Sequence, residues 1–357
     1  MDELPVTTVV ATAGFIIGIV FGAIVFRTNF CTMGSISDML SFGDSRRFRA
    51  WLLSIAVALA GAQGLQYAGL VDLSQSIYLT PSFNWAGNIV GGLMFGFGMV
   101  LAGGCASRNL ARVGSGDIRS LIVLTVMGIF AYMTLRGLIA VGRVEIETLV
   151  TTDLTQAGLS SQGLGEIVAG LTGLDAATAH AAVFAIVLAL LLIASFASKA
   201  FRSSPVHILS GLGIGLCVVA GWWATGVLGA DEFDPTPLAS LTFVAPTGNA
   251  LQYLMTFSGS SINFGIATVG GTILGAFLAA VAMGRFRLTT FADVPDTLRN
   301  FVGAMLMGVG GVVALGCTVG QAITGVSTLA LGSMLAFAAI VAGGIAGIKY
   351  MERALDI

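Results

Sequence analysis

An internal duplication is the feature of this sequence that most restricts its fold. The segment Asn88–Cys105 (NIVGGLMFGFGMVLAGGC) matches Asn300–Cys317 (NFVGAMLMGVGGVVALGC) at an offset of 212 residues, and nine of the eighteen positions are identical. The residues that recur are Asn88, Val90, Gly91, Gly96, Gly98, Val100, Ala102, Gly104 and Cys105. Two glycine-rich apolar segments at matching places in two halves, each ending in Gly-Cys, indicate an internal duplication around one site.

The composition agrees with a membrane location. Hydrophobic residues make up 56% of the chain and charged residues 10%, and the mean hydropathy is +0.95; these values are typical of a polytopic membrane protein. The four cysteines form no CxxC pair and the two histidines stand alone, so no metal signature is present. We expect no cleavable signal peptide, since the first apolar run lacks a basic leader and is long enough to span.

Nine apolar stretches are long enough to cross a bilayer. They lie at about Val6–Phe26, Phe48–Leu70, Asn84–Gly103, Ile118–Val141, Ala179–Ala200, His207–Leu228, Ile262–Gly284, Asn300–Leu315 and Leu329–Ile348. Shorter segments are predicted to enter the membrane and return, at Arg27–Leu40, Cys105–Gly114 and Cys317–Ser327, with a further short helix at Gly248–Ser258. The acidic segment Gly142–Thr178 is predicted to be an exposed linker.

The charge distribution predicts an orientation. If the short elements return to the side from which they enter, every basic residue except Arg136 and Arg143 falls on one side of the membrane. The positive-inside rule makes that side cytoplasmic, which places the amino terminus outside and the carboxyl terminus inside.

The same topology predicts how the two halves are related. We expect a single transmembrane domain over residues 1–357, with one repeat at about 6–141, a linker and fifth span at 142–200, and a second repeat at 207–348. Because one span separates the repeats, the second repeat starts on the opposite face. The predicted fold is therefore an all-α polytopic membrane protein with about nine transmembrane helices, short re-entrant helices and two inverted, pseudo-symmetric repeats. The two Gly-Cys turns should enter from opposite faces and meet near the middle of the membrane.

Three segments resemble the YeeE/YedE sulphur-transport family: FRTNFCTMGSISD, LAGGCASRNLARVGSGDIRSL and ALGCTVGQAITGVSTLALGS. The resemblance implies uptake of thiosulfate across the bacterial inner membrane, through a narrow path marked by three cysteines that match Cys31, Cys105 and Cys317. Some members carry or partner a sulphur-carrier domain, so a cytoplasmic sulphur-carrier protein is an expected partner. Thiosulfate is a dianion with one soft terminal sulfur, and a thiol offers it a weak donor without a tight ionic grip.

Other residues near these cysteines are candidates for substrate contact. Gly104 and Gly316 allow the backbone to approach closely, and the helix starts after the cysteines can aim N–H groups at an anion. Arg108 is a candidate for anion exit or a pair for Asp117, and Asn109 and Gln321 either cap helices or touch substrate. Cys217 is interpreted as a small apolar residue.

Two other functions remain open. The chain could transport another small anion, such as sulfite or a selenium compound, or it could be a membrane component that handles persulfide sulfur, which requires thiolates and a resolving partner. The chain has no Walker signature, so an ATP-driven mechanism within it is not expected. We predict a transporter rather than an enzyme, without a cofactor or nucleic-acid partner, in contact with the lipid bilayer.

Overall fold

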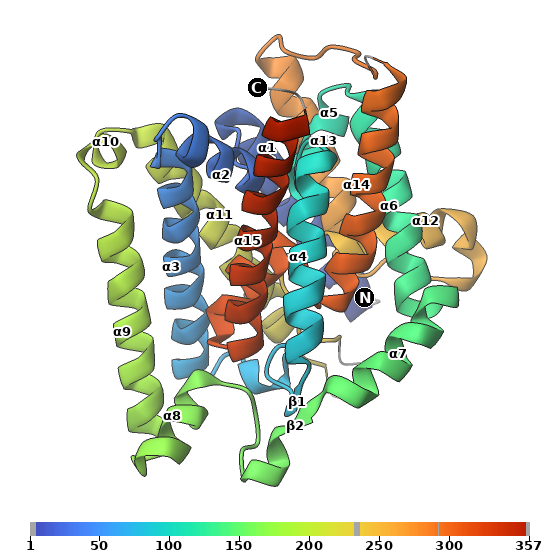
Figure 1. Ribbon diagram of the computed structural model, residues 1–357. Coiled ribbons are helices and arrows are strands. Elements are labelled where there is room, and N and C mark those ends of the chain that lie inside the picture. Colours follow the sequence, from blue (N-terminus) through green and yellow to red (C-terminus); the bar gives the residue numbers. More distant parts are fainter. Residues whose placement is uncertain (1–4, 232–235, 292, 355–357) are drawn as a thin grey trace.

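The computed structural model of the protein describes residues 5–231, 236–291 and 293–354, and within these ranges it is almost wholly helical (Figure 1). Nine helical stretches in the described part are long and apolar enough to cross a membrane, which confirms the predicted class and number of spans. The spanning helices are α1 (Val6–Thr28), α3 (Arg46–Tyr67), α4 (Trp85–Leu101), α6 (Ile118–Arg136), α9 (Ala176–Phe196), α11 (Pro205–Trp223), α13 (Phe264–Ala282), α14 (Val294–Val313) and α15 (Leu331–Ala354).

Short helices follow the spans where the sequence predicts interruptions. They are α2 (Thr32–Ser41), α5 (Ala106–Gly114), the π-helix η5 (Thr318–Gly325) with the 3₁₀ turn η6 (Val326–Thr328), and α12 (Val244–Met255). A further π-helical turn, η3 (Ala224–Leu228), extends α11. The fourth short helix begins four residues before its predicted start at Gly248. The 212-residue offset that relates the Gly-Cys segments also places α2 on residues 244–253, so α12 is the second copy of α2.

The region between the repeats is more ordered than predicted. The segment expected to be a plain linker, Gly142–Thr178, overlaps α7 (Leu138–Val150) and contains β2 (Thr152–Asp153), η2 (Leu154–Ala157) and α8 (Leu164–Thr172). Strand β2 pairs antiparallel with β1 (Ser82–Phe83). The buried Gln162 accepts the amide N–H of Leu331 at its own carbonyl, at 3.0 Å, and its side-chain oxygen accepts from Gly332, at 3.2 Å. Much of the segment is exposed, but Gln162 attaches it to the start of α15.

Three further short elements complete the described part of the chain. They are η1 (Leu73–Gln75), α10 (Lys199–Arg202) and η4 (Phe257–Gly259). In Figure 1, α2, α5 and α10 lie at the upper end, whereas α8 and the β1–β2 pair lie at the lower end.

The two copies of the duplicated segment pack against each other as antiparallel helices. A Cβ atom at Gly91 in α4 would lie 2.6 Å from the nitrogen of Ala314 and 2.7 Å from the oxygen of Gly310. The equivalent contact in the other repeat is made by Gly303 in α14, which corresponds to Gly91 through the 212-residue offset. A Cβ atom at Gly303 would lie 2.5 Å from the nitrogen of Ala102 and 2.7 Å from the oxygen of Gly98. Such close approach requires glycine. Matching contacts between antiparallel partners are what a two-fold axis in the membrane plane produces.

Other helix neighbours follow the same relation. Helix α1 packs on α13, and their counterparts α11 and α3 pack on each other; α4 packs on α15, and their counterparts α14 and α6 do likewise. Helix α9 has no counterpart in this scheme and packs chiefly on α3 and α8. The pairing supports the inverted arrangement of two repeats, with α9 outside both.

Candidate functional site

Three of the four cysteines occupy the same local position. Cys31, Cys105 and Cys317 are the N-cap residues of α2, α5 and η5, all in extended backbone and all buried. Free N–H groups at a helix start face its N-cap, so each thiol lies where a helix can favour an anion. The sequence predicts this for Cys105 and Cys317 and places Cys31 near the start of its helix. Cys217 lies inside α11 instead.

A left-handed residue stands two positions before each of these cysteines. Asn29, Gly103 and Leu315 have φ angles of 54°, 69° and 57°. This conformation ends the preceding helix and turns the chain into the short one. Leu315 is costly in it because its Cβ is crowded. These left-handed turns were not predicted, although Gly103 and Asn29 are residues that favour the conformation.

The first two cysteines form a single site. The thiols of Cys31 and Cys105 lie close enough to interact with each other, and the start of α2 at Gly34 lies beside Cys31. The hydroxyl of Ser107 lies 3.4 Å from Sγ of Cys105. Cys31 and Cys105 are therefore a pair of neighbouring thiols at one place in the fold.

The third cysteine has different neighbours. Its Sγ accepts a hydrogen bond from the backbone N–H of Gly320 at 3.4 Å and lies 3.9 Å from the hydroxyl of Thr242. Thr242 and Phe243 correspond through the offset to Phe30 and Cys31. The second half therefore has Phe243 at the position of Cys31, so Cys31 has no cysteine counterpart there.

A small polar cavity adjoins the third cysteine's helix. Its volume is about 10 Å³, roughly the space of one water molecule, and it is lined by Tyr78, Ser82, Asn84, Asn88, Gln162, Leu315, Gln321, Gly332 and Ser333. Its polar groups are all neutral. Burial raises the pKa of Tyr78, so its phenol stays a hydrogen-bond donor. Two larger hollows, between α4, α7 and α14 and between α1 and α13, have mostly apolar walls and contain none of the cysteines.

The two matched amides support the turns that carry the thiols. Nδ2 of Asn109 donates to the carbonyls of Gly104 and Cys105 at 2.9 and 3.3 Å, and Nε2 of Gln321 donates to the carbonyl of Ala314. The Asn109 side-chain oxygen accepts from Ser120 at 3.0 Å. Oε1 of Gln321 is buried with no hydrogen-bond partner in the described residues, and Gln321 lines the polar cavity. The geometry gives Asn109 a structural task and leaves Gln321 able to contact a ligand.

The two glycines before the cysteines leave room for later side chains. A Cβ at Gly104 would lie 3.3 Å from Cγ of Arg108, and one at Gly316 would lie 3.2 Å from Cγ of Gln321. These glycines therefore let the arginine and the glutamine fold back over the thiol turns.

Arg108 does not pair with Asp117, which was one of its two expected roles. Its Nη2 donates to Oδ1 of Asn29 at 2.8 Å. Asp117 instead caps α6 by accepting from the backbone and the hydroxyl of Ser120, and it faces Arg119 at 3.9 Å. Arg108 is thereby directed toward Cys31, with which it interacts electrostatically.

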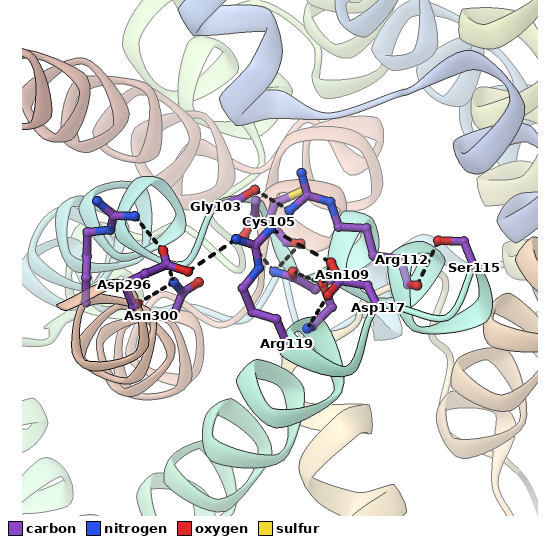
Figure 2. A network of polar contacts seen from close by, with 12 residues as sticks. Gly103, Cys105, Asn109, Arg112, Ser115, Asp117, Arg119, Asp296 and Asn300 are labelled. Atoms are coloured by element: carbon purple, nitrogen blue, oxygen red, sulfur yellow. Dashed lines mark hydrogen bonds and ion pairs between the residues drawn. The ribbon is translucent and has the colours of Figure 1, made fainter. Parts of the chain in front are cut away.

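A polar network extends from the Cys105 turn to the start of α14 (Figure 2). Arg119 bridges Asp117 and Asp296, at 3.9 and 3.5 Å, and Asp296 also binds Arg299 at 2.6 Å and Asn300 at 3.0 Å. Through the offset, Asp296 and Asn300 correspond to Asn84 and Asn88 of the polar cavity. One end of the molecule thus carries a cavity where the other carries ion pairs.

Comparison with known proteins extends the likeness over most of the chain. A family model described as Sulphur transport matches residues 27–346. The chain is 30% identical over 332 residues to the thiosulfate transporter TsuA of Escherichia coli, covering 87% of this chain and 85% of that protein. It is 28% identical over 330 residues to the thiosulfate transporter TsuA of Spirochaeta thermophila, covering 90% and 93%. A probable transporter YedE of Escherichia coli is 31% identical over 103 residues, 28% of this chain and 23% of that protein.

Proposed function

The chain belongs to the Sulphur transport family, and on that premise we propose that it imports thiosulfate by a stepwise relay past buried thiols. The coarser function, transport of a sulfur-containing anion by a multi-pass membrane protein, agrees with both thiosulfate transporters that it resembles. The proposal also places the protein in the inner membrane, with the amino terminus outside and the carboxyl terminus in the cytoplasm.

The observation that carries the proposal is the shared position of Cys31, Cys105 and Cys317. All three are buried N-caps of short helices at breaks between spans. Interrupted helices that bring helix starts to an interior site are typical of transporters that bind anions. A structural thiol would not require three repetitions of this arrangement.

The relay follows from the cost of moving a dianion through protein. A charged group in an apolar interior is unstable unless donors replace its water. The polar cavity beside Gln321 offers neutral donors at the proposed outer end, and Cys317 with the N–H of Gly320 is the first sulfur site. The adjacent thiols of Cys31 and Cys105 are the second. Neutral donors hold the anion weakly enough for release at each step.

A transporter for another small anion is the second candidate, since the neutral cavity and thiols do not by themselves select thiosulfate over sulfite. A persulfide-handling component is less well supported, although the adjacent thiols of Cys31 and Cys105 are a pair on which such chemistry could act. A cytoplasmic sulphur-carrier protein remains a proposed partner.

Growth of a host that lacks sulfur uptake, with thiosulfate as its sole sulfur source, tests the proposal. We expect the protein to restore growth, Cys105→Ala and Cys317→Ala to abolish it, and Cys31→Ala to weaken it, all at normal membrane levels. Cys217→Ala is the matched control, since that cysteine is buried but caps no helix. Serine variants separate the mechanisms, because serine keeps a donor but removes sulfur chemistry. Equal defects from all four alanine variants would contradict the relay.

A further inference from the structure

A group of arginines surrounds the thiol pair at the end of the molecule opposite the polar cavity. Arg47 of α3 and Arg108 of α5 both bind Asn29: Nη2 of Arg47 donates to its carbonyl at 2.7 Å and Nη2 of Arg108 to its side-chain oxygen at 2.8 Å. Both guanidinium groups interact electrostatically with Cys31. One asparagine in a left-handed turn thus holds two cations beside the thiols.

Space for the first arginine is provided by a glycine of α2. A Cβ atom at Gly34 would lie 2.5 Å from Nη2 of Arg47 and 2.8 Å from Nη1. The guanidinium therefore lies directly against the first turn of α2, next to the backbone N–H groups that follow Cys31. Two positive features, a helix start and a guanidinium, face the same small region.

Two polar atoms in this region have no hydrogen-bond partner among the described residues. Thr32, the first residue of α2, is 1% exposed and its hydroxyl oxygen is unpaired, and Nε of Arg47 is buried and unpaired as well. Buried polar groups are ordinarily paired, and leaving one unpaired costs about 1–3 kcal/mol. Unpaired donors beside cations and a thiol are what a bound oxyanion would satisfy.

The charges of the group suit a dianion. Arg112 lies close enough to interact with Arg108 and donates to the carbonyl of Gly103 at 2.7 Å. Asp38 forms an ion pair with Nη1 of Arg47 at 2.8 Å. Three guanidinium groups and one carboxylate leave two positive charges. The planar donors of a guanidinium group match the oxygens of sulfur and phosphorus oxyanions. Some of these donors are already bound to Asn29 and Asp38, which limits the affinity for the anion.

We propose that Arg47, Arg108, Thr32 and Cys31 form an inner subsite for a doubly charged sulfur oxyanion, on the cytoplasmic side of the thiol relay. This inference rests on the proposed function, and it adds a second binding position that differs in kind from the neutral outer cavity. The outer cavity accepts the anion through neutral donors, and the inner subsite draws it past the thiol pair by charge. Release then needs only exchange of the anion for water at the cytoplasmic mouth.

Sided transport measurements test the subsite. Purified protein is reconstituted in proteoliposomes, and thiosulfate flux is measured with substrate varied on the outer or the inner face. We expect Arg47→Gln and Arg108→Gln to raise the inner-face KM at least tenfold and to change the outer-face KM less than twofold. The matched control is Arg46→Gln, which removes the neighbouring charge from an exposed side chain paired with Asp44.

Conservative variants protect the test against loss of folding. Arg47→Lys and Arg108→Lys keep the charge but lose the fork, so they should fold and raise the inner-face KM by a smaller factor. The subsite would be overturned by an unchanged inner-face KM in these variants, or by an equal loss of flux from both faces. Either result would mean that the arginines only stabilise the packing of α1, α3 and α5.

Sulfate, which has the same charge but no soft sulfur, separates this inference from the proposed function. If the wild-type protein moves no thiosulfate, the proposed function is wrong. Calorimetric binding of sulfate to the wild-type protein then tests the subsite alone. Weaker binding in Arg108→Gln than in Arg46→Gln would support it, and equal binding would overturn it.

Discussion

The contact between α4 and α14 gives the most quantitative prediction. A Cβ at Gly303 would lie 2.5 Å from the backbone nitrogen of Ala102, whereas ordinary contact begins at 3.4 Å. The Gly303→Ala variant therefore forces the helices apart by about 0.9 Å at this point. Overpacking of this kind costs ~1–3 kcal/mol, and the alanine returns up to ~1 kcal/mol through helix propensity. We expect a net loss of ~1–2 kcal/mol.

The control is Gly270→Ala in α13, where the nearest atom to a new Cβ is Cε2 of Phe15 at 3.7 Å. This variant gains the same propensity without the overlap, so it should leave stability unchanged or raised. Thermal denaturation of the purified protein in detergent measures the difference between the two variants, which reports the overlap alone.

The duplication sharpens the prediction further. Gly91→Ala makes the symmetry-related overlap with Ala314, at 2.6 Å, and should lower the melting temperature as much as Gly303→Ala. The double variant should lose less than the sum, because one separation of α4 from α14 relieves both overlaps. Equal melting temperatures for Gly303→Ala and Gly270→Ala would refute the reasoning, and a strictly additive double variant would refute the shared separation.

Three further predictions concern the site and its orientation. Asp117→Asn removes the charge that caps α6 and faces Arg119, so the melting temperature should fall by the equivalent of ~1 kcal/mol. An unchanged melting temperature would show that the polar network of Figure 2 does not stabilise the fold. Tyr78→Phe removes a neutral donor from the polar cavity beside Gln321. In the proposed orientation this cavity is the outer end of the path, so the outer-face KM should rise several-fold. Because burial raises the Tyr78 pKa above its usual value, wild-type uptake should not fall through phenol ionisation as the pH rises toward ~10. A tag inserted within residues 151–159 should be reachable from outside intact cells, and its protection there would reverse the proposed orientation.

The sequence by itself determined the class, the span count and the duplication. Hydropathy over some twenty residues is a local property that decides which segments can cross a bilayer, so the nine spans could be located without knowing how they pack. The duplicated Gly-Cys segments predicted two inverted repeats, and the close contact of α4 with α14 agrees with that arrangement. The same 212-residue offset, applied to the segment after Cys31, would also have located α12 correctly.

Only the tertiary structure decided which groups share a site. Arg47 is sixteen positions from Cys31 and on another helix, and nothing in its local sequence marks it as a neighbour of the thiols. Arg108 binds Asn29 rather than the nearer Asp117 because the left-handed turn at Asn29 brings α1 to the start of α5. Likewise, Gln162 attaches the segment between the repeats to α15 through contacts some 170 residues apart. Such pairings depend on how closely distant helices pack, since a backbone approach allowed by glycine determines which side chains meet, and no local pattern records that distance.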